Sequence, residues 1–153
     1  MPKGATEDQA AGYAAEVLKR CADYSGNKGV ILGLENHGGI TAQAARIIQI
    51  VKQVDSPWVG INLDTGNFRS NAFPQIEMCI PYAVNVQVKV EMVGDDGTRG
   101  PADWDRVIQM LVKGGYRGYL ALEYEAKESA VTAVPRLTRK LGDLIRKHSN
   151  HPV

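Results

Sequence analysis

Four polar side chains lie at the ends of four short apolar stretches of the sequence: Glu35, Asp64, Gln87 and Glu123. Successive members are separated by about the length of one strand–helix unit, roughly 30 residues. The carboxyl ends of parallel strands meet at one edge of a sheet, so we expect these four groups to converge there. Convergence of the four carries more information than any of them alone.

Three carboxylates at one place need a counter-charge. Each is costly to desolvate without a partner, and neighbouring carboxylates raise one another's pKa values. A divalent cation removes both problems, and oxygen donors suit Mg²⁺ or Mn²⁺. The carboxamide oxygen of Gln87 can add a neutral ligand. The sequence therefore predicts one divalent metal ion bound by Glu35, Asp64, Gln87 and Glu123.

Each of these residues also has a purely structural interpretation. Asp64 precedes Thr-Gly-Asn and is typical of a turn, and Glu35 can cap the loop that follows it. Gln87 can be a polar position of a sheet, and Glu123, followed by Glu125, can be a solvated strand end. Four such positions in register favour the metal site over these separate explanations.

The elements that must position this site alternate along the chain. Thr6 and Gln9 fit a capping box that begins a first helix, and Asp103 can cap a later one. Thr41 is expected to cap the second helix, and Pro74 suits a first helical turn. The expected strands are 30–35, 58–64, 83–90 and 118–124, and a last helix places apolar residues at 131, 134, 137, 141 and 144 on one side.

The order is one helix followed by four strand–helix units. This alternation predicts an α/β fold with a parallel sheet and right-handed crossovers. No linker or low-complexity tract interrupts residues 1–153, so a single domain is expected.

Composition narrows the function classes. Hydrophobic residues make up 44% and charged residues 23% of the chain, as in soluble globular proteins. The net charge of +1 comes with scattered basic residues, which argues against a nucleic-acid partner. No apolar run is long enough for a membrane span, and no secretory signal is expected. Cys21 and Cys79 match no redox or metal spacing, so the cytoplasm is the expected compartment.

The motifs together resemble a known family. They are Leu-Glu-Asn-His-Gly-Gly at 34–39, Asn-Leu-Asp-Thr-Gly-Asn at 62–67, Gln-Val-Lys at 87–89, and Gly-Tyr-Arg-Gly-Tyr at 115–119 leading to Glu-Tyr-Glu at 123–125. This series resembles the sugar isomerase/epimerase branch of the xylose-isomerase-like TIM-barrel superfamily. The resemblance implies the C-terminal half of a (β/α)₈ barrel, strands five to eight, with one divalent ion, often Mn²⁺, Mg²⁺ or Co²⁺.

The resemblance also implies residue roles. Glu35 and Glu123 match ligands that commonly act as the acid/base pair beside a substrate carbonyl. Gln87 stands where the family usually has a ligand histidine, a departure that should weaken affinity for softer metals such as Zn²⁺. His37, Asn67 and Lys89 look like contacts to the substrate, although His37 also fits a plain loop histidine.

Three functions are compatible with this resemblance. The first is a metal-dependent sugar or sugar-phosphate isomerase/epimerase acting through an enediolate, and the second is a non-catalytic half-barrel that retains the metal site. An apurinic endonuclease of the same superfamily fits least, because it uses several histidine ligands for zinc. The only histidines here are His37, His148 and His151.

The expected sheet lacks the first four strands of the barrel. Open apolar strand edges invite pairing with another chain, so a homodimer that closes the barrel, or a separate N-terminal half, is a candidate partner. A natural truncation and a deliberate fragment remain alternatives. The segment 94–100 is either a turn or a phosphate-binding loop with Arg99 as its only basic group, and its two acidic residues favour the turn.

Overall fold

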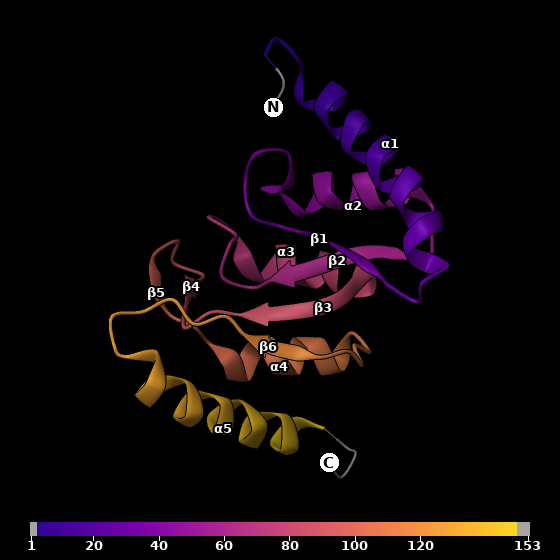
Figure 1. Cartoon of the computed structure of the whole chain (residues 1–153). Coiled ribbons are helices and arrows are strands. Elements are labelled where there is room, and N and C mark those ends of the chain that lie inside the picture. The colour runs from indigo at the N-terminus through magenta and orange to yellow at the C-terminus, as the bar shows by residue number, and fades with distance from the viewer. Residues whose placement is uncertain (1–2, 150–153) are drawn as a thin grey trace.

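The computed structural model describes residues 3–149 and contains the predicted parallel sheet (Figure 1). Four strands form it in the order β1-β2-β3-β6, and every neighbouring pair is parallel. Their bounds are β1 Leu32–Glu35, β2 Val59–Asp64, β3 Ala83–Val88 and β6 Leu120–Leu122. All the strands start or end within a few residues of the predicted limits. The α/β class and the four-stranded parallel sheet are confirmed.

Helices pack against one face of this sheet. The other face, called the inner face below, is partly exposed to solvent. The helices are α1 Glu7–Gly26, α2 Ala44–Val54, α3 Ala72–Cys79, α4 Trp104–Lys113 and α5 Ala130–His148, with short 3₁₀ turns at Gly39–Thr41 and Ile80–Tyr82. Ile61, Leu63, Val86 and Val88 point toward the helices and are fully buried. Their alternating neighbours Asn62, Asn85 and Gln87 lie on the inner face and are half-buried. Side chains alternate along a strand, so the strand sequences produce one apolar and one polar face.

Two of the predicted helix caps are present and one is wrong. Thr6 and Gln9 form the reciprocal capping box of α1, and Asp103 accepts a hydrogen bond from the Arg106 N–H at 3.0 Å. Thr41 does not cap α2, because a 3₁₀ turn intervenes and its hydroxyl accepts from the backbone N–H of His37 at 3.2 Å. The Ala44 N–H at the start of α2 instead donates to the Gln75 side-chain oxygen of α3 at 2.8 Å.

An antiparallel hairpin follows β3 and was not predicted. Its strands are β4 Glu91–Val93 and β5 Arg99–Pro101, and Figure 1 shows them beyond the arrowheads of β2 and β3. The connecting segment is a turn, since the Gly94 N–H donates to the Thr98 carbonyl at 2.9 Å and Gly97 has a φ of 78°. Arg99 donates from Nη2 to the Gly66 carbonyl at 2.8 Å. The turn interpretation of 94–100 is therefore correct.

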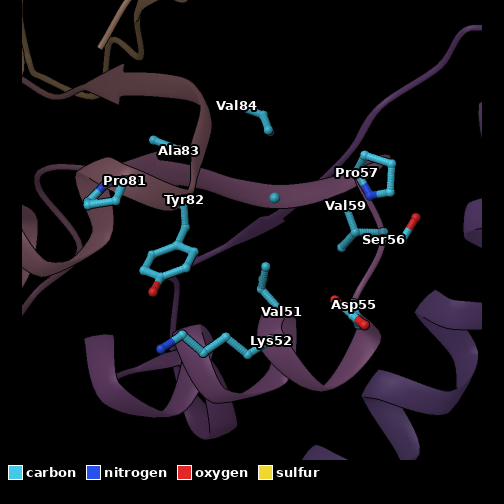
Figure 2. A pocket seen from close by; sticks show the side chains of 11 residues that line it. Val51, Lys52, Asp55, Ser56, Pro57, Val59, Pro81, Tyr82, Ala83 and Val84 are labelled. Carbon is cyan, nitrogen blue, oxygen red and sulfur yellow. The ribbon is translucent and has the colours of Figure 1, made fainter. Parts of the chain in front are cut away.

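The two ends of the parallel sheet differ in character. At the start of β2 and β3 lies an open pocket of about 450 Å³ between the strands and the end of α2 (Figure 2). Lys52 and Asp55 are its charged residues, and the Lys52 ammonium lies 5.4 Å from the centre of the Tyr82 ring. In α/β barrels this end of the strands serves stability, and chemistry is placed at the other end. Within residues 3–149, no helix is long and apolar enough to cross a membrane.

Candidate metal centre

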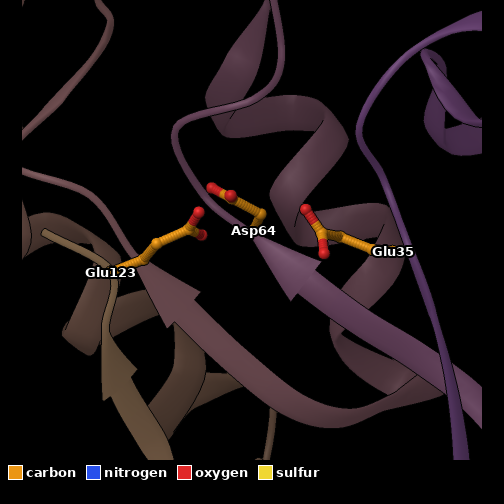
Figure 3. Close-up of side chains that lie close together, drawn as sticks. All are labelled: Glu35, Asp64 and Glu123. Atoms are coloured by element: carbon orange, nitrogen blue, oxygen red, sulfur yellow. The ribbon is translucent and has the colours of Figure 1, made fainter. Parts of the chain in front are cut away.

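The carboxylates of Glu35, Asp64 and Glu123 meet at the carboxyl end of the sheet. Glu35 and Asp64 are the last residues of β1 and β2, and Glu123 directly follows β6, with its N–H bonded to the Val88 carbonyl at 2.9 Å. One oxygen from each carboxylate lies within 4.8 Å of the others. Figure 3 shows the three side chains pointing toward a common space from three elements. The parallel register thus brings together residues that are far apart in sequence.

Asp64 is the most firmly held member of this cluster. Its side chain is completely buried. The buried Asn36 side chain donates to the Asp64 carbonyl at 2.7 Å and accepts from the Asp64 N–H at 2.8 Å. The Gly66 N–H donates to Asp64 Oδ1 at 2.8 Å, the local bond expected of a turn-forming aspartate. The turn and the cluster interpretations of Asp64 therefore both describe the structure.

Asn67 connects two of the carboxylates. Its Nδ2 donates to Asp64 Oδ2 at 2.7 Å and to Glu35 Oε1 at 3.2 Å. The amide therefore lies beside the cluster. His37 is exposed in the loop after β1. Of the three predicted substrate contacts, Asn67 thus lies against the carboxylates, and its role toward a substrate stays a prediction.

Lys89 supplies the ammonium of the cluster. It is 7% exposed, and its Nζ lies 2.6 Å from Glu125 Oε2, 2.9 Å from Glu123 Oε1 and 3.5 Å from Asp64 Oδ2. Burial acts to lower the pKa of Lys89, but hydrogen bonds to Glu125 and Glu123 outweigh it and raise the pKa above its usual value. Lys89 is therefore charged and is held among acidic groups.

Burial and Lys89 shift the carboxyl groups in opposite directions. Burial raises the pKa of Asp64 to about 7, because desolvation disfavours the charged form. For Glu123 burial also acts to raise the pKa, yet the hydrogen bond from Lys89 contributes to a net lowering. Two neighbouring carboxyl groups thus differ in how readily they ionise.

Stability of the metal-free protein should depend on pH through Asp64. The pKa of its carboxyl rises from an ordinary value near 3.8 to about 7 in the folded protein. Between about pH 4 and pH 7 the folded state therefore binds more protons than the unfolded state. The free energy of unfolding should fall as pH rises through this range, by at most about 1.4 kcal/mol per pH unit.

Urea unfolding in the presence of chelator, between pH 5 and pH 8, measures this dependence. The Asp64→Asn variant provides the control, since its amide does not titrate. A smaller loss of stability with rising pH in the variant supports the assignment. Equal pH profiles for the two proteins would contradict it.

Gln87 contacts the cluster through nitrogen. Its Nε2 donates to Glu123 Oε2 at 3.0 Å, and its Oε1 accepts from the Asn62 side chain. The residue therefore lies where a fourth ligand was predicted, with its amide nitrogen toward Glu123. Its role as a ligand stays a prediction.

Three asparagines of the site were not identified from the sequence. Asn36 fixes the backbone of Asp64, and Asn62 and Asn85 lie beside Gln87 on the inner face, bonded to each other at 2.8 Å. A signal for two of them was present. Asn62 and Asn85 lie two residues before Asp64 and Gln87, and residues two apart on a strand share a face.

The donor set suits a hard divalent cation. Glu35, Asp64, Glu123 and the adjacent Glu125 are four acidic groups, and within residues 3–149 Lys89 forms ion pairs with three of them. The Lys89 ammonium carries a single charge, and a divalent ion with oxygen ligands would add two more. The residues present therefore fit Mg²⁺ or Mn²⁺, and the oxygen-rich set disfavours softer metals.

The acidic cluster lies at the carboxyl end of the parallel sheet, where α/β barrels place their chemistry. The family described as xylose isomerase-like TIM barrel matches residues 1–148, and the chain belongs to it. The resemblance expected from the motifs is thus confirmed. Comparison of the sequence with curated proteins gives no match.

Solved structures share the fold at low sequence identity. A xylose isomerase-like TIM barrel protein from Mycobacterium smegmatis, in complex with magnesium, has a TM-score of 0.74 at 18% identity, over 91% of this chain and 52% of that one. The 3-keto-D-glucoside 4-epimerase of E. coli has a TM-score of 0.69 at 16% identity, over 96% of this chain and 57% of that one. The D-psicose 3-epimerase of Clostridium cellulolyticum H10, with D-tagatose, has a TM-score of 0.67 at 21% identity, over 95% of this chain and 55% of that one. The chain therefore spans little more than half the length of these relatives.

Proposed function

We propose that this chain carries the metal-binding half of a divalent-metal-dependent sugar or sugar-phosphate isomerase/epimerase. The observation that carries the proposal is the meeting of Glu35, Asp64 and Glu123 within 4.8 Å at the carboxyl ends of parallel strands. The family membership and the sugar epimerases among its structural relatives support the substrate class. In this proposal the metal ligands are Glu35, Asp64, Gln87 and Glu123, and the metal is Mg²⁺ or Mn²⁺, with Co²⁺ as an alternative.

The proposed chemistry is proton transfer next to a ketose carbonyl. A bound divalent ion supplies the positive charge that stabilises the enediolate oxygens of the substrate. Glu35 and Glu123 form the pair that removes the proton and returns it. Return to the opposite face of the same carbon is epimerisation. Return to the neighbouring carbon, with transfer of the hydroxyl proton from one oxygen to the other, is isomerisation.

Other residues of the chain position the substrate in this proposal. Asn67 and Lys89 lie against the carboxylates and offer N–H donors to sugar hydroxyl groups. His37, in the exposed loop after β1, is the third proposed contact to the substrate. The Asn36 side chain is bonded to the backbone of Asp64 on both its nitrogen and its oxygen, and it acts through the position of that residue.

Deuterium uptake tests the function directly. The chain is incubated in D₂O with Mn²⁺ and a panel of ketoses and ketose phosphates, and incorporation at the carbon next to the carbonyl is followed by NMR. Uptake that requires the ion supports the proposal. Saturable Mn²⁺ binding without uptake from any sugar of the panel would favour the second candidate, a half-barrel that binds metal but catalyses nothing.

That second candidate has a specific observation behind it. The chain spans 52–57% of the length of the relatives compared above, and the inner face of its sheet is only half-buried. A barrel active site draws catalytic and binding residues from several strands around the ring. The four-stranded sheet therefore needs a further half to enclose a substrate.

We propose that a second copy of the chain supplies this half, with a separate N-terminal half-barrel as the alternative. The sheet ends at β1 and β6, and hydrophobic side chains next to these edges are exposed: Val30 and Ile31 at 51% each and Tyr119 at 87%. Open apolar edges pair readily with other strands, and a twofold axis would close both edges at once. Sedimentation at micromolar concentration should therefore give a dimer mass.

Replacement of Ile31 by lysine should shift this equilibrium toward the monomer, because charged side chains at an edge oppose strand pairing. The matched control is Met78→Lys, which changes an exposed hydrophobic residue of α3. A monomer mass for the unmodified chain would contradict the homodimer and leave the N-terminal half as the partner.

A further inference from the structure

Three carboxamides lie in a row on the inner face of the sheet and lead to Glu123. Asn62 and Asn85 are register partners on β2 and β3, and Gln87 lies two residues beyond Asn85. Asn85 Nδ2 donates to Asn62 Oδ1 at 2.8 Å, Asn62 Nδ2 donates to Gln87 Oε1, and Gln87 Nε2 donates to Glu123 Oε2 at 3.0 Å. We call Asn62, Asn85 and Gln87 the amide ladder.

The direction of these hydrogen bonds follows from the charge of Glu123. An ionised carboxylate only accepts hydrogen bonds, whereas a carboxamide has a donor end and an acceptor end. Gln87 must therefore turn its nitrogen toward Glu123 and its oxygen toward Asn62. Asn62 must then present its nitrogen to Gln87 and its oxygen to Asn85. One orientation thus fixes the next along the whole amide ladder.

This direction conflicts with metal ligation by Gln87. A cation is bound by the carboxamide oxygen, and in the present arrangement that oxygen faces Asn62. Rotation of the terminal amide by 180° exchanges the positions of its oxygen and nitrogen. The torsion energy of this bond has roughly two-fold symmetry, so both orientations are accessible. If Gln87 rotates alone, its nitrogen meets the Asn62 nitrogen, and two donors then face each other. Rotation of all three amides avoids this and preserves the two internal hydrogen bonds with reversed direction.

We propose that Asn62 and Asn85 are positioning residues that turn together with Gln87, so that binding of a divalent ion reverses the amide ladder and directs the Gln87 oxygen to the ion. This inference rests on the proposed metal site. In the reversed state Gln87 Nε2 donates to Asn62 Oδ1, and Asn62 Nδ2 donates to Asn85 Oδ1. The single bond given up is the one from Gln87 to Glu123, and a bound ion would compensate for its loss.

NMR of the full chain with Mg²⁺, which is diamagnetic, tests the reversal. In metal-free protein the Asn62 side-chain amide protons should show nuclear Overhauser contacts to the Gln87 side chain. At saturating Mg²⁺ the Asn62 amide protons should lose these contacts and show nuclear Overhauser contacts to the Asn85 side chain instead. The side-chain amide of Asn27, which is exposed on the end of α1, should be unaffected and serves as the internal control.

A variant supplies a second readout. Gln87→Leu should lower Mg²⁺ affinity by at least about tenfold, as expected when a group that orients or ligates a metal is lost. The reversal of the amide ladder would be contradicted if Mg²⁺ binds while the Asn62 contacts stay unchanged, or if Gln87→Leu binds Mg²⁺ with full affinity. Either result would still be compatible with a metal site formed by the three carboxylates. Absence of Mg²⁺ binding to the unmodified chain would overturn both the amide ladder and the proposed function.

Discussion

Replacement of Glu35 or Glu123 by glutamine is expected to lower ketose turnover by at least about 10²-fold. General acid–base catalysis contributes about 10²–10⁴-fold, and glutamine removes the titratable oxygen while it keeps a similar shape. Both residues lie in the cluster whose oxygens are within 4.8 Å of one another. The effect should appear in kcat at saturating Mn²⁺, in any assembly of this chain that is catalytically competent.

Two controls separate loss of proton transfer from loss of the ion. Calorimetric titration of each variant with Mn²⁺ shows whether the ion still binds at the concentration used for the assay. Glu91→Gln changes an exposed glutamate of the β4–β5 hairpin and should keep the activity of the unmodified chain. Full activity in both Glu35→Gln and Glu123→Gln would contradict their assignment as the acid/base pair.

Replacement of Asn36 by alanine is expected to lower the free energy of unfolding by about 2–4 kcal/mol. Asn36 is 1% exposed, and its amide makes two hydrogen bonds, at 2.7 and 2.8 Å, with the backbone of the buried Asp64. Each buried group left without a partner costs about 1–3 kcal/mol. Urea unfolding of the metal-free protein measures the change.

The same variant should also weaken Mn²⁺ binding, because Asn36 fixes the chain at Asp64. The matched control is Asn27→Ala, which removes an exposed asparagine side chain at the end of α1 and should change stability by less than about 0.5 kcal/mol. Equal stabilities of the two variants would show that the bonds of Asn36 contribute little.

The sheet was predictable from the sequence because its signal is local. Each strand is a short apolar run, and helix signals separate the runs, so their parallel arrangement follows from general rules of connection. The hairpin was missed because its strands are only three residues long, although Asp96-Gly97 is a common hairpin turn. Thr41 was misplaced as a cap because the 3₁₀ turn 39–41 delays the start of α2.

The three carboxylates of the site were predictable for a different reason. They stand at the last positions of their strands or one residue beyond, and parallel strands bring such ends to one edge of the sheet. The partners of these residues depend on register, which sequence patterns specify poorly. The pairing of Asn62 with Asn85 follows an irregularity between Ile61 and Asn62, so the amide ladder required coordinates.

The polar inner face distinguishes this sheet from the interior of many barrels. Barrel interiors are commonly filled by bulky branched side chains, whereas here Asn62, Asn85 and Gln87 lie on the inner face. Amides that are partly removed from water are tolerated when each finds a partner, and these three half-buried amides are bonded to one another. The inner face therefore serves the site by orienting polar groups toward Glu123.

Calorimetric titration of the chelator-treated chain with Mn²⁺, beside the Asp64→Ala variant, decides whether the three carboxylates bind a metal ion. We expect saturable binding of about one ion per chain and its loss in Asp64→Ala, with both proteins folded by circular dichroism. Absence of saturable binding to the unmodified chain, or equal binding by the variant, would contradict the claim that Glu35, Asp64 and Glu123 form a metal site.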